Sequence, residues 1–302
     1  MCCFLLPCPL SLLVSLVSLD YKSKCKKPTP VRYPLPHTFE TGFSITGNSS
    51  YPIFFGICYA DCWQFVIFGK VPQYCMVVSA TIPPLAQDTL TLKAVWANIG
   101  YDSCPHHYNF HLHTHCSDGQ MSPQDLMRQA LDIGLKGLAI TDHHSIEGYQ
   151  QAQIWLENEH LKGSLPHLWT GVEITANLLE TEVHILGYGF DPTHTVLTPY
   201  LQRAKPEGDI ALASRVINSL QQAGALVVLA HPFRYHRPAA DLVAAAVELG
   251  IDGIEAFYAY GNPKPWLPSQ PETEQALALS RQYQLFATCS TDSHGKSLLH
   301  RI

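Results

Sequence analysis

Two histidines near the middle of the chain have a spacing that suits metal binding. His111 and His113 are two residues apart, so on a β-strand both imidazoles would lie on one face and reach the same ion. The alternative is a half-buried polar face with no ligand. The chain has 16 histidines among 302 residues, and a side chain that binds borderline metals is rarely used so often for packing. The pattern predicts a metal site.

Further histidines and carboxylates follow other short apolar runs, at or just past the point where each run ends. A single histidine in such a place is usually a structural hydrogen-bonding group. Six separate runs, counting that of His111 and His113, favour one shared site instead. The residues are Asp118, Asp142, His143, Glu173, His184, His231, Asp292 and His294.

The elements that must position these residues are an alternation of strand-like and helix-like segments. We expect strands at 108–113, 137–141, 168–175, 183–188, 226–230, 253–257 and 286–290, and helices at 123–133, 147–161, 210–223, 239–249 and 272–283. Strand followed by helix, repeated, predicts a parallel sheet with helices outside. Seven strands favour a closed or distorted α/β barrel, whose active site lies at the carboxyl ends of the strands. The chain has no glycine-rich dinucleotide or Walker-type loop, which disfavours a nucleotide-cofactor fold.

Six segments, taken in chain order, resemble the motifs of the polymerase and histidinol phosphatase (PHP) domain family. They are His111-Leu-His113 with Ser117-Asp118-Gly119, Ile140-Thr141-Asp142-His143, Gly171-Val172-Glu173-Ile174, Val183-His184-Ile185-Leu186-Gly187, Ala230-His231-Pro232 and Thr291-Asp292-Ser293-His294-Gly295. The resemblance covers residues 109–302. Six motifs in the right order are hard to obtain by chance.

The resemblance implies a distorted seven-stranded (β/α)7 barrel and nine ligands for two to three divalent ions, with Asp118 and Glu173 also serving catalysis. His111, His113, Glu173 and Asp292 would bind the first ion, Asp118, His143 and His294 the second, and Glu173 as a bridge with His184 and His231 the third. Mixed imidazole and carboxylate ligands suit Mn²⁺, Zn²⁺ or Fe²⁺. Ions about 3.5–4 Å apart can share a water, lower its pKa and present hydroxide to a phosphorus atom, so no protein nucleophile is needed.

Four other residues near the motifs have weaker assignments. Arg234 follows His231 by three residues and either grips a phosphate or is an ordinary surface arginine. Asp142 is expected to orient His143, and His115 is expected to be a surface or supporting residue, with metal ligation less favoured. His144 occupies a position where one PHP subgroup usually has aspartate.

The segment from Ala230 to Tyr235 resembles the PHP subgroup that acts on nucleoside 3′,5′-bisphosphates and on 5′ ends of short RNA. That resemblance implies a phosphoesterase, a phosphatase or exonuclease, with a small nucleotide or RNA end as substrate. The subgroup has a long helical cap between its fourth and fifth motifs, whereas only 47 residues separate His184 from His231 here. The cap is therefore largely absent. Alternatives are a histidinol-phosphate-type phosphatase and a catalytically silent metal-binding regulatory module.

The N-terminal 75 residues differ in composition from the rest. They contain seven of the ten cysteines, and an apolar stretch at 10–19 that is too short to span a bilayer. We expect residues 1–75 to be a non-native or disordered extension upstream of a start at Met76, residues 76–106 to be a helical lead-in, and 107–302 to be the main domain; a secretory or membrane-associated leader is the alternative. Cys58 and Cys62 have zinc-like spacing but no second pair at finger distance.

Charge and cysteine usage limit the partners and the compartment. Residues 1–75 carry six basic and three acidic side chains, and residues 76–302 carry 13 basic and 22 acidic side chains. An acidic domain disfavours binding to duplex nucleic acid, although bound cations still allow a phosphate substrate. Only Cys104, Cys116 and Cys289 remain after residue 75, which is typical of a reducing compartment. We expect a cytoplasmic protein without membrane attachment.

Overall fold

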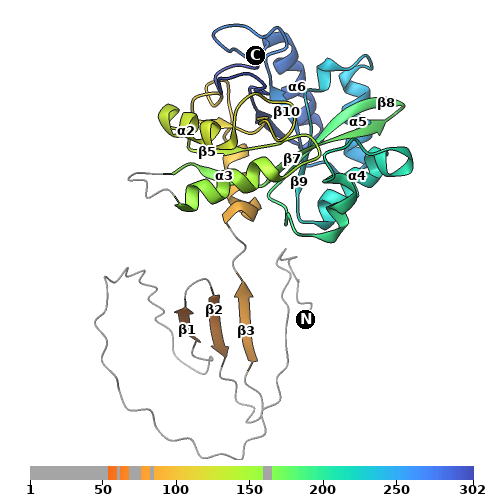
Figure 1. Ribbon diagram of the computed structural model, residues 1–302. Coiled ribbons are helices and arrows are strands. Elements are labelled where there is room, and N and C mark those ends of the chain that lie inside the picture. The colour runs from red at the N-terminus through yellow and green to blue at the C-terminus, as the bar shows by residue number, and fades with distance from the viewer. Residues whose placement is uncertain (1–53, 60–61, 68–75, 82–84, 159–164) are drawn as a thin grey trace, which may run out of the picture. The chain divides into compact units, whose positions relative to one another are not determined.

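The computed structural model of the chain divides into two units, Met1–Ile82 and Pro83–Ile302. It describes residues 54–59, 62–67, 76–81, 85–158 and 165–302 (Figure 1). The N-terminal unit contains an antiparallel sheet of β1 (Phe54–Tyr59), β2 (Cys62–Ile67) and β3 (Met76–Thr81) in that order. The apolar segment 1–19 lies outside the described residues. Among the described residues, no helix is both long and apolar enough to cross a membrane.

The lead-in expected at 76–106 is helical only in its middle. Strand β3 covers its first six residues, followed by the 3₁₀ turn η1 (Leu85–Gln87) and helix α1 (Thr89–Trp96). Helix α1 begins where it does because the Asp88 side chain accepts a hydrogen bond from the Thr91 amide at 3.0 Å. Leu92 and Trp96 of α1 are buried in the main core of the second unit.

Eight short strands of the second unit form two sheets. The five-stranded sheet has the order β11 (Phe286–Cys289), β10 (Gly253–Phe257), β9 (Leu226–Leu229), β8 (Thr181–Tyr188) and β7 (Gly171–Leu178). The three-stranded sheet has the order β4 (Tyr108–Asn109), β5 (Gly137–Ala139) and β6 (His167–Trp169). The strand expected at 168–175 is therefore two strands, β6 and β7, which belong to different sheets.

Strand β8 runs against the expected direction. It pairs antiparallel with both β7 and β9, whereas the other pairs in the second unit are parallel. Leu179 and Glu180, both with positive φ (50° and 60°), form a two-residue turn that folds β7 back on β8. A wholly parallel sheet was thus the wrong prediction, because this hairpin replaces a helical crossover.

The seven-stranded barrel is not confirmed, because the two sheets do not close into one ladder. Within the described residues, two isolated parallel bridges link the sheets, Leu112 with Ser293 and His143 with Glu173. Strands β4 and β5 have two and three residues, since the chain beyond each leaves the ladder and carries the histidines of the predicted site. The confirmed architecture is an α/β fold with mostly parallel strands.

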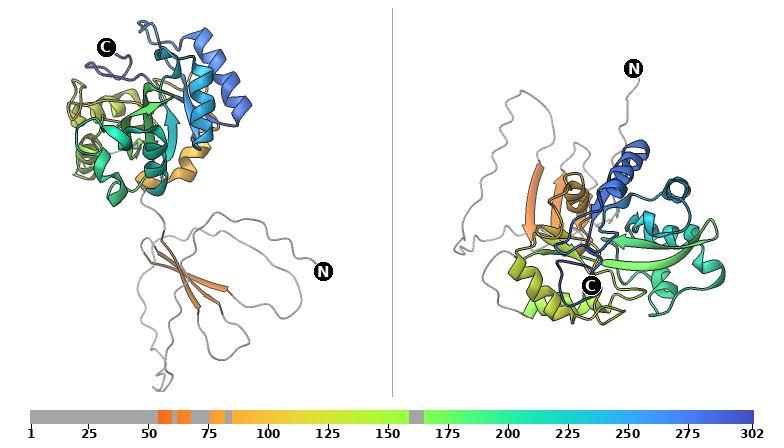
Figure 2. Two further views of the ribbon diagram at one scale, coloured as in Figure 1. Left: turned by 90° about the vertical axis from the view of Figure 1, so that its right-hand side faces the viewer. Right: turned by 90° about the horizontal axis from the view of Figure 1, so that it is seen from above.

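Five helices cover the strands of the second unit. They are α2 (Pro123–Ile133), α3 (Glu147–Asn158), α4 (Ala213–Gln222), α5 (Ala239–Glu248) and α6 (Gln270–Tyr283). Helices α2 and α3 pack together over a smaller apolar cluster, on the side of the unit away from α6 (Figures 1 and 2). Helix α4 packs on β7, β8 and β9, and α6 on β10 and β11. The end predicted for α3 at 159–161 lies outside the described residues.

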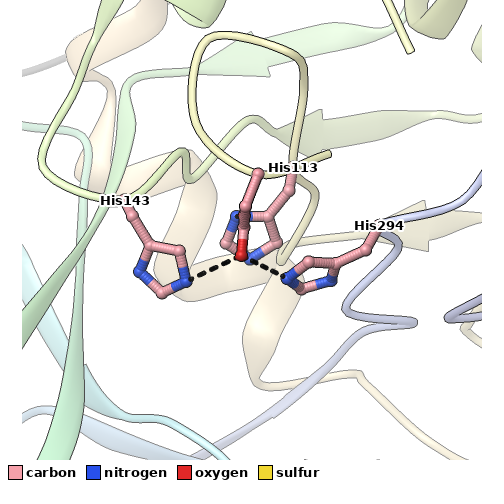
Figure 3. A group of neighbouring side chains, drawn as sticks. His113, His143 and His294 are labelled. Atoms are coloured by element: carbon pink, nitrogen blue, oxygen red, sulfur yellow. Dashed lines mark ion pairs between the residues drawn. The ribbon is translucent and has the colours of Figure 1, made fainter. Parts of the chain in front are cut away.

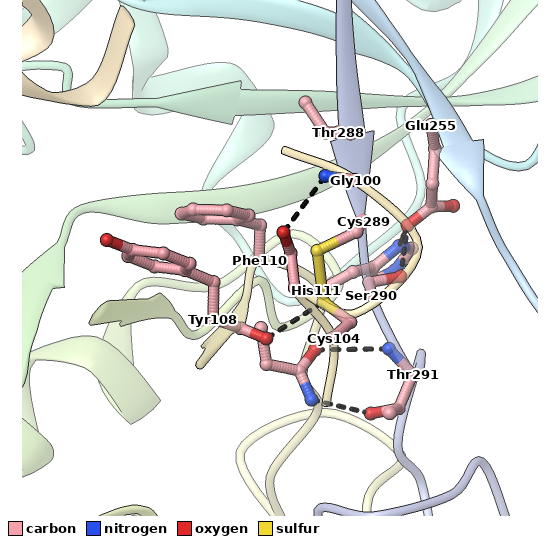
Figure 4. The surroundings of a disulfide bond; sticks show 12 residues. Gly100, Cys104, Tyr108, Phe110, His111, Glu255, Thr288, Cys289, Ser290 and Thr291 are labelled. Carbon is pink, nitrogen blue, oxygen red and sulfur yellow. Dashed lines mark hydrogen bonds and ion pairs between the residues drawn. A yellow bond between two sulfur atoms is a disulfide. The ribbon is translucent and has the colours of Figure 1, made fainter. Parts of the chain in front are cut away.

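A disulfide joins Cys104, in the segment before β4, to Cys289, the last residue of β11 (Figure 4). Reduced cysteines were expected in this part of the chain, so the expectation is wrong for this pair. Their Cα atoms lie 6.0 Å apart, within the range that a disulfide spans. Cys116 is buried and free.

The second unit contains its own apolar core and all the predicted ligands, so residues 76–302 are expected to fold and to keep the metal content and activity of the longer chain. The measurement compares circular dichroism, elemental analysis and phosphate release for chains 1–302 and 76–302. Insolubility or loss of activity on removal of residues 1–75 would show that the upstream segment is required.

Candidate metal centre

His111 and His113 lie just beyond β4 and are fully buried. Their segment is fixed by backbone hydrogen bonds: the His113 amide donates to Ser293 at 3.0 Å, and the Thr141 amide donates to the Leu112 carbonyl at 2.8 Å. Leu112, between the two histidines, belongs to the apolar cluster under α2 and α3. The alternation predicted from the sequence therefore holds, and both imidazoles reach the same group of carboxylates.

Glu173 on β7 lies at the centre of the cluster and is 1% exposed. Its two oxygens face different sets of histidines. Oε2 lies 3.0 Å from His111 Nε2, 3.2 Å from His113 Nε2 and 3.4 Å from His143 Nε2, and Oε1 lies 2.8 Å from His184 Nδ1 and 3.5 Å from His231 Nε2. A carboxylate with both oxygens surrounded in this way has the geometry of a bridging ligand.

Asp118 lies at the open side of the cluster, with its side chain about half exposed. Its oxygens lie 3.3 Å from His294 Nε2, 3.5 Å from His113 Nδ1 and 3.8 Å from His143 Nε2. The three imidazoles converge on this point (Figure 3). Asp118 is therefore the carboxylate of the cluster that both a metal ion and solvent can reach.

The two carboxylate oxygens of Asp292 have different partners: one faces the histidines, and the other accepts hydrogen bonds from neighbouring side chains. Oδ1 lies 3.2–3.4 Å from imidazole nitrogens of His111, His113 and His294. Oδ2 accepts hydrogen bonds from Tyr258 Oη at 2.7 Å, Arg301 Nε at 2.8 Å and Arg234 Nη1 at 3.2 Å. These three hydrogen bonds to Oδ2 hold the carboxylate so that Oδ1 faces the cluster.

The donor set fits divalent metal ions. Four groups have potential ligand atoms that all lie within 4.8 Å of one another, and together they contain all nine residues predicted from the sequence: His113, Asp118, His143 and His294; His111, His231 and Asp292; His111, His113 and Glu173; His143, Glu173 and His184. Buried atoms in these groups, His113 Nε2, Glu173 Oε1, His184 Nδ1 and His231 Nδ1, make no hydrogen bond of good geometry. Buried polar atoms need partners, and metal ions would supply them.

The grouping differs in detail from the one that the resemblance implied. His113 joins Asp118 at the open side, His231 groups with His111 and Asp292, and His143 groups with Glu173. Four residues each belong to two groups: His111, His113, His143 and Glu173. The assignment of each ligand to a particular ion stays a prediction.

Burial and neighbouring charges set the protonation of the cluster. Burial opposes a charge on His113, but the carboxylates of Asp292 and Glu173, each 3.2 Å from its Nε2, outweigh burial and raise its pKa to about 9. Burial would raise the pKa values of the Glu173 and Asp292 carboxyls, yet the surrounding histidines hold them well below their usual range. Burial lowers the pKa of His143 to about 4. The carboxylates are therefore ionised at neutral pH, while His113 carries a proton that a metal must displace.

Mn²⁺ affinity is accordingly expected to rise with pH between 7 and 9. Because the pKa of His113 is raised, the protonated form dominates at pH 7, and each pH unit toward pH 9 should strengthen binding about tenfold for this one proton. Equilibrium dialysis against Mn²⁺ at several pH values measures the slope. An affinity that is constant over this range would contradict the assignment of His113 as a ligand.

The structure changes the roles expected for some neighbouring residues. Asp142 does not contact the His143 ring; its carboxylate accepts hydrogen bonds from the Thr114 amide and hydroxyl and from Ser117 Oγ, each at 2.7 Å. Asp142 therefore stabilises the turn that leads to Asp118. His115 is exposed and belongs to none of the four groups among the described residues. His144 Nε2 lies 3.1 Å from Thr175 Oγ1.

Three residues close to the ligands were missed by the sequence analysis: Glu255, Tyr258 and Arg301. Glu255 is a buried carboxylate in the otherwise apolar strand β10, and this position was a signal that could have been used. Nothing in the local sequence indicated that Arg301 would reach Asp292.

The fold and the cluster define an α/β domain with a candidate metal centre between its two sheets. Residues 109–230 match the family model of the PHP domain.

The chain is also similar to known proteins and to a solved structure. The chain is 35% identical over 140 residues to a 5′-3′ exoribonuclease of Haemophilus influenzae, covering 42% of this chain and 49% of that protein. It is 30% identical over 116 residues to a 3′,5′-nucleoside bisphosphate phosphatase of Chromobacterium violaceum, covering 38% of this chain and 39% of that protein. A solved amidohydrolase from Chromobacterium violaceum shares the fold, with a TM-score of 0.53 at 18% identity over 64% of this chain and 90% of that one. The chain thus spans about half, or less, of these two relatives' lengths.

Proposed function

We propose that the second unit is a metal-dependent hydrolase of phosphate esters. The observation that carries the proposal is the convergence of nine histidines and carboxylates, several with buried atoms that have no hydrogen-bond partner. Two or three divalent ions, Mn²⁺, Zn²⁺ or Fe²⁺, would supply Lewis acidity and a water of lowered pKa. The PHP domain match and the names of the two relatives support the same class of reaction.

The protein side chains have distinct tasks in this proposal. Glu173, ionised and buried, presents one oxygen to each half of the cluster. Asp118 lies where substrate enters, and His294 with its neighbouring histidines keeps the pKa of its carboxyl low despite partial burial. Arg234, whose side chain is 39% exposed beside Asp292, would donate hydrogen bonds to a phosphate oxygen.

The substrate we propose is a nucleoside 3′,5′-bisphosphate, losing its 3′-phosphate, or the 5′ end of a short RNA. The two relatives are named as a 5′-3′ exoribonuclease and a 3′,5′-nucleoside bisphosphate phosphatase, and Arg234 would offer a cationic contact for a second phosphate. Only one α-helix, α4, lies between β8 and β9, so the structure provides few residues there to enclose a nucleotide. Duplex nucleic acid is not proposed as a partner, because residues 76–302 are acidic overall.

Hydrolysis of a generic aryl phosphate tests the proposed class of reaction. Protein stripped with a chelator is expected to release no phosphate, and addition of Mn²⁺ should restore turnover in wild type and in a His115→Ala control. A panel of nucleoside bisphosphate, 5′-phosphorylated short RNA and histidinol phosphate then ranks the substrates. Metal binding without turnover of any of them would favour the silent regulatory module.

We also propose a cytoplasmic location, which rests on the small number of cysteines after residue 75. The Cys104–Cys289 disulfide is a bond that an oxidising compartment preserves. The disulfide therefore conflicts with the cytoplasmic location that the cysteine content favours. Mass spectrometry after alkylation of the freshly lysed cell shows which state the protein has: free Cys104 and Cys289 support the cytoplasm, and a disulfide opposes it.

A further inference from the structure

Glu255 lies in the middle of β10 and is 1% exposed, although the rest of that strand is apolar. A buried carboxylate destabilises the fold unless its oxygens have polar partners. Its contacts should therefore show why the fold keeps it.

Both oxygens of Glu255 have partners, and two of the three partners belong to predicted metal ligands. Oε1 lies 3.1 Å from His111 Nδ1 and also accepts a hydrogen bond from Ser290 Oγ (Figure 4). Oε2 accepts a hydrogen bond from the backbone amide of His231 at 2.9 Å. Because these contacts use both oxygens, and Glu255 belongs to none of the four candidate groups, it is not placed as a tenth ligand.

The contact with His111 fixes which imidazole nitrogen faces the centre. A proton on Nδ1 that is donated to Glu255 leaves the lone pair of Nε2 directed at the cluster, where Nε2 lies 3.0 Å from Glu173 Oε2. Without that acceptor, the neutral ring could place its proton on either nitrogen, and one of the two forms cannot bind a metal through Nε2.

The contact with His231 supports an unusual backbone. His231 has φ 27° and ψ 63°, a conformation with positive φ that residues other than glycine rarely adopt. Such a conformation persists only where surrounding contacts enforce it. The hydrogen bond from its amide to Glu255 is one such contact, and in this conformation the imidazole stands 3.5 Å from Glu173.

We infer that Glu255 is a positioning residue, which orients the His111 ring and the His231 backbone so that both histidines can bind metal beside Glu173. The inference rests on the proposed metal centre, but it concerns binding and not turnover. Its test therefore measures metal affinity and needs no substrate.

The experiment compares Mn²⁺ binding by wild type, Glu255→Gln and Ser290→Ala in equilibrium dialysis, with circular dichroism as the check of folding. Glutamine keeps the size of the side chain but can accept at only one of its two ends, so affinity should fall about 10- to 100-fold, as for other residues that orient ligands. The number of ions bound at saturating Mn²⁺ should not change. Ser290→Ala removes the third contact of the carboxylate but neither histidine contact, so its affinity should stay close to wild type.

Several outcomes would overturn the inference. Unchanged affinity in Glu255→Gln would do so, and so would an equal loss of affinity in Ser290→Ala. The loss of an ion from Glu255→Gln even at saturating Mn²⁺ would show instead that Glu255 is a ligand. If Glu255→Gln does not fold, Glu255→Asp replaces it; this variant keeps the charge but is too short for both histidines, so wild-type affinity there would also refute the role. Absence of Mn²⁺ binding in wild type would instead refute the metal centre itself.

Discussion

Replacement of Glu173 by glutamine is expected to lower metal content and activity together. The carboxylate faces His111, His113 and His143 with one oxygen and two more histidines with the other, so it is the ligand that two ions would share. The amide has no charge and only one good acceptor atom. We expect the loss of at least one ion per chain and a fall in kcat/KM of roughly 100-fold or more, above the range for residues that only support ligands.

His115→Ala is the matched control for this prediction. His115 lies two residues from His113, yet it is exposed and outside the four groups. Elemental analysis and aryl phosphate hydrolysis of the two variants should separate them clearly. A Glu173→Gln protein with the metal content of wild type would show that Glu173 does not bridge, and loss of metal in His115→Ala would show that the ligand set is wrong.

Replacement of Arg234 by alanine is expected to weaken turnover of a nucleoside bisphosphate by roughly 30- to 1,000-fold in kcat/KM. This corresponds to about 2–4 kcal/mol for a charge-assisted contact with a second phosphate. The metal content should not change, because Tyr258 and Arg301 still donate hydrogen bonds to Asp292 Oδ2. A single-phosphate aryl substrate has no second group to bind and should lose less.

Arg237→Ala provides the control for charge, since Arg237 lies on the same segment but contacts Thr181 and not Asp292. The comparison of both substrates in wild type and both variants at fixed Mn²⁺ decides the role of Arg234. Equal losses on the two substrates would mean that Arg234 acts on the scissile phosphate or on Asp292 alone. No loss on either would make it an ordinary surface arginine.

Helix positions could be predicted well where local signals are strong. Helix α2 has the bounds predicted from the sequence, because Ser122 caps its start with a hydrogen bond to the Asp125 amide and Gly134 ends it with φ 81°. The direction of β8 could not be predicted in the same way. Its hairpin turn uses Leu179 and Glu180, which lack the glycine or asparagine that usually marks such turns.

The candidate site was predictable as a set but not in its arrangement. Each predicted ligand lies at a recognisable place in the sequence, and all nine side chains come together in the structure. Which ligands group, and what supports them, depends on contacts between distant segments. The pair His111 and Glu255, for example, is separated by 144 residues. Whether the strands close into a barrel also depends on contacts between distant segments. Among the described residues, two isolated bridges link the two sheets, and no continuous ladder closes them.

Anomalous diffraction from crystals grown with Mn²⁺ tests the central claim most directly, because it counts the ions and places each one against its ligands. We predict two to three peaks within the cluster, with Glu173 contacting at least two of them and Glu255 none. A single peak, or peaks that lie away from Glu173, would contradict the multi-ion centre on which the proposed phosphoesterase activity depends.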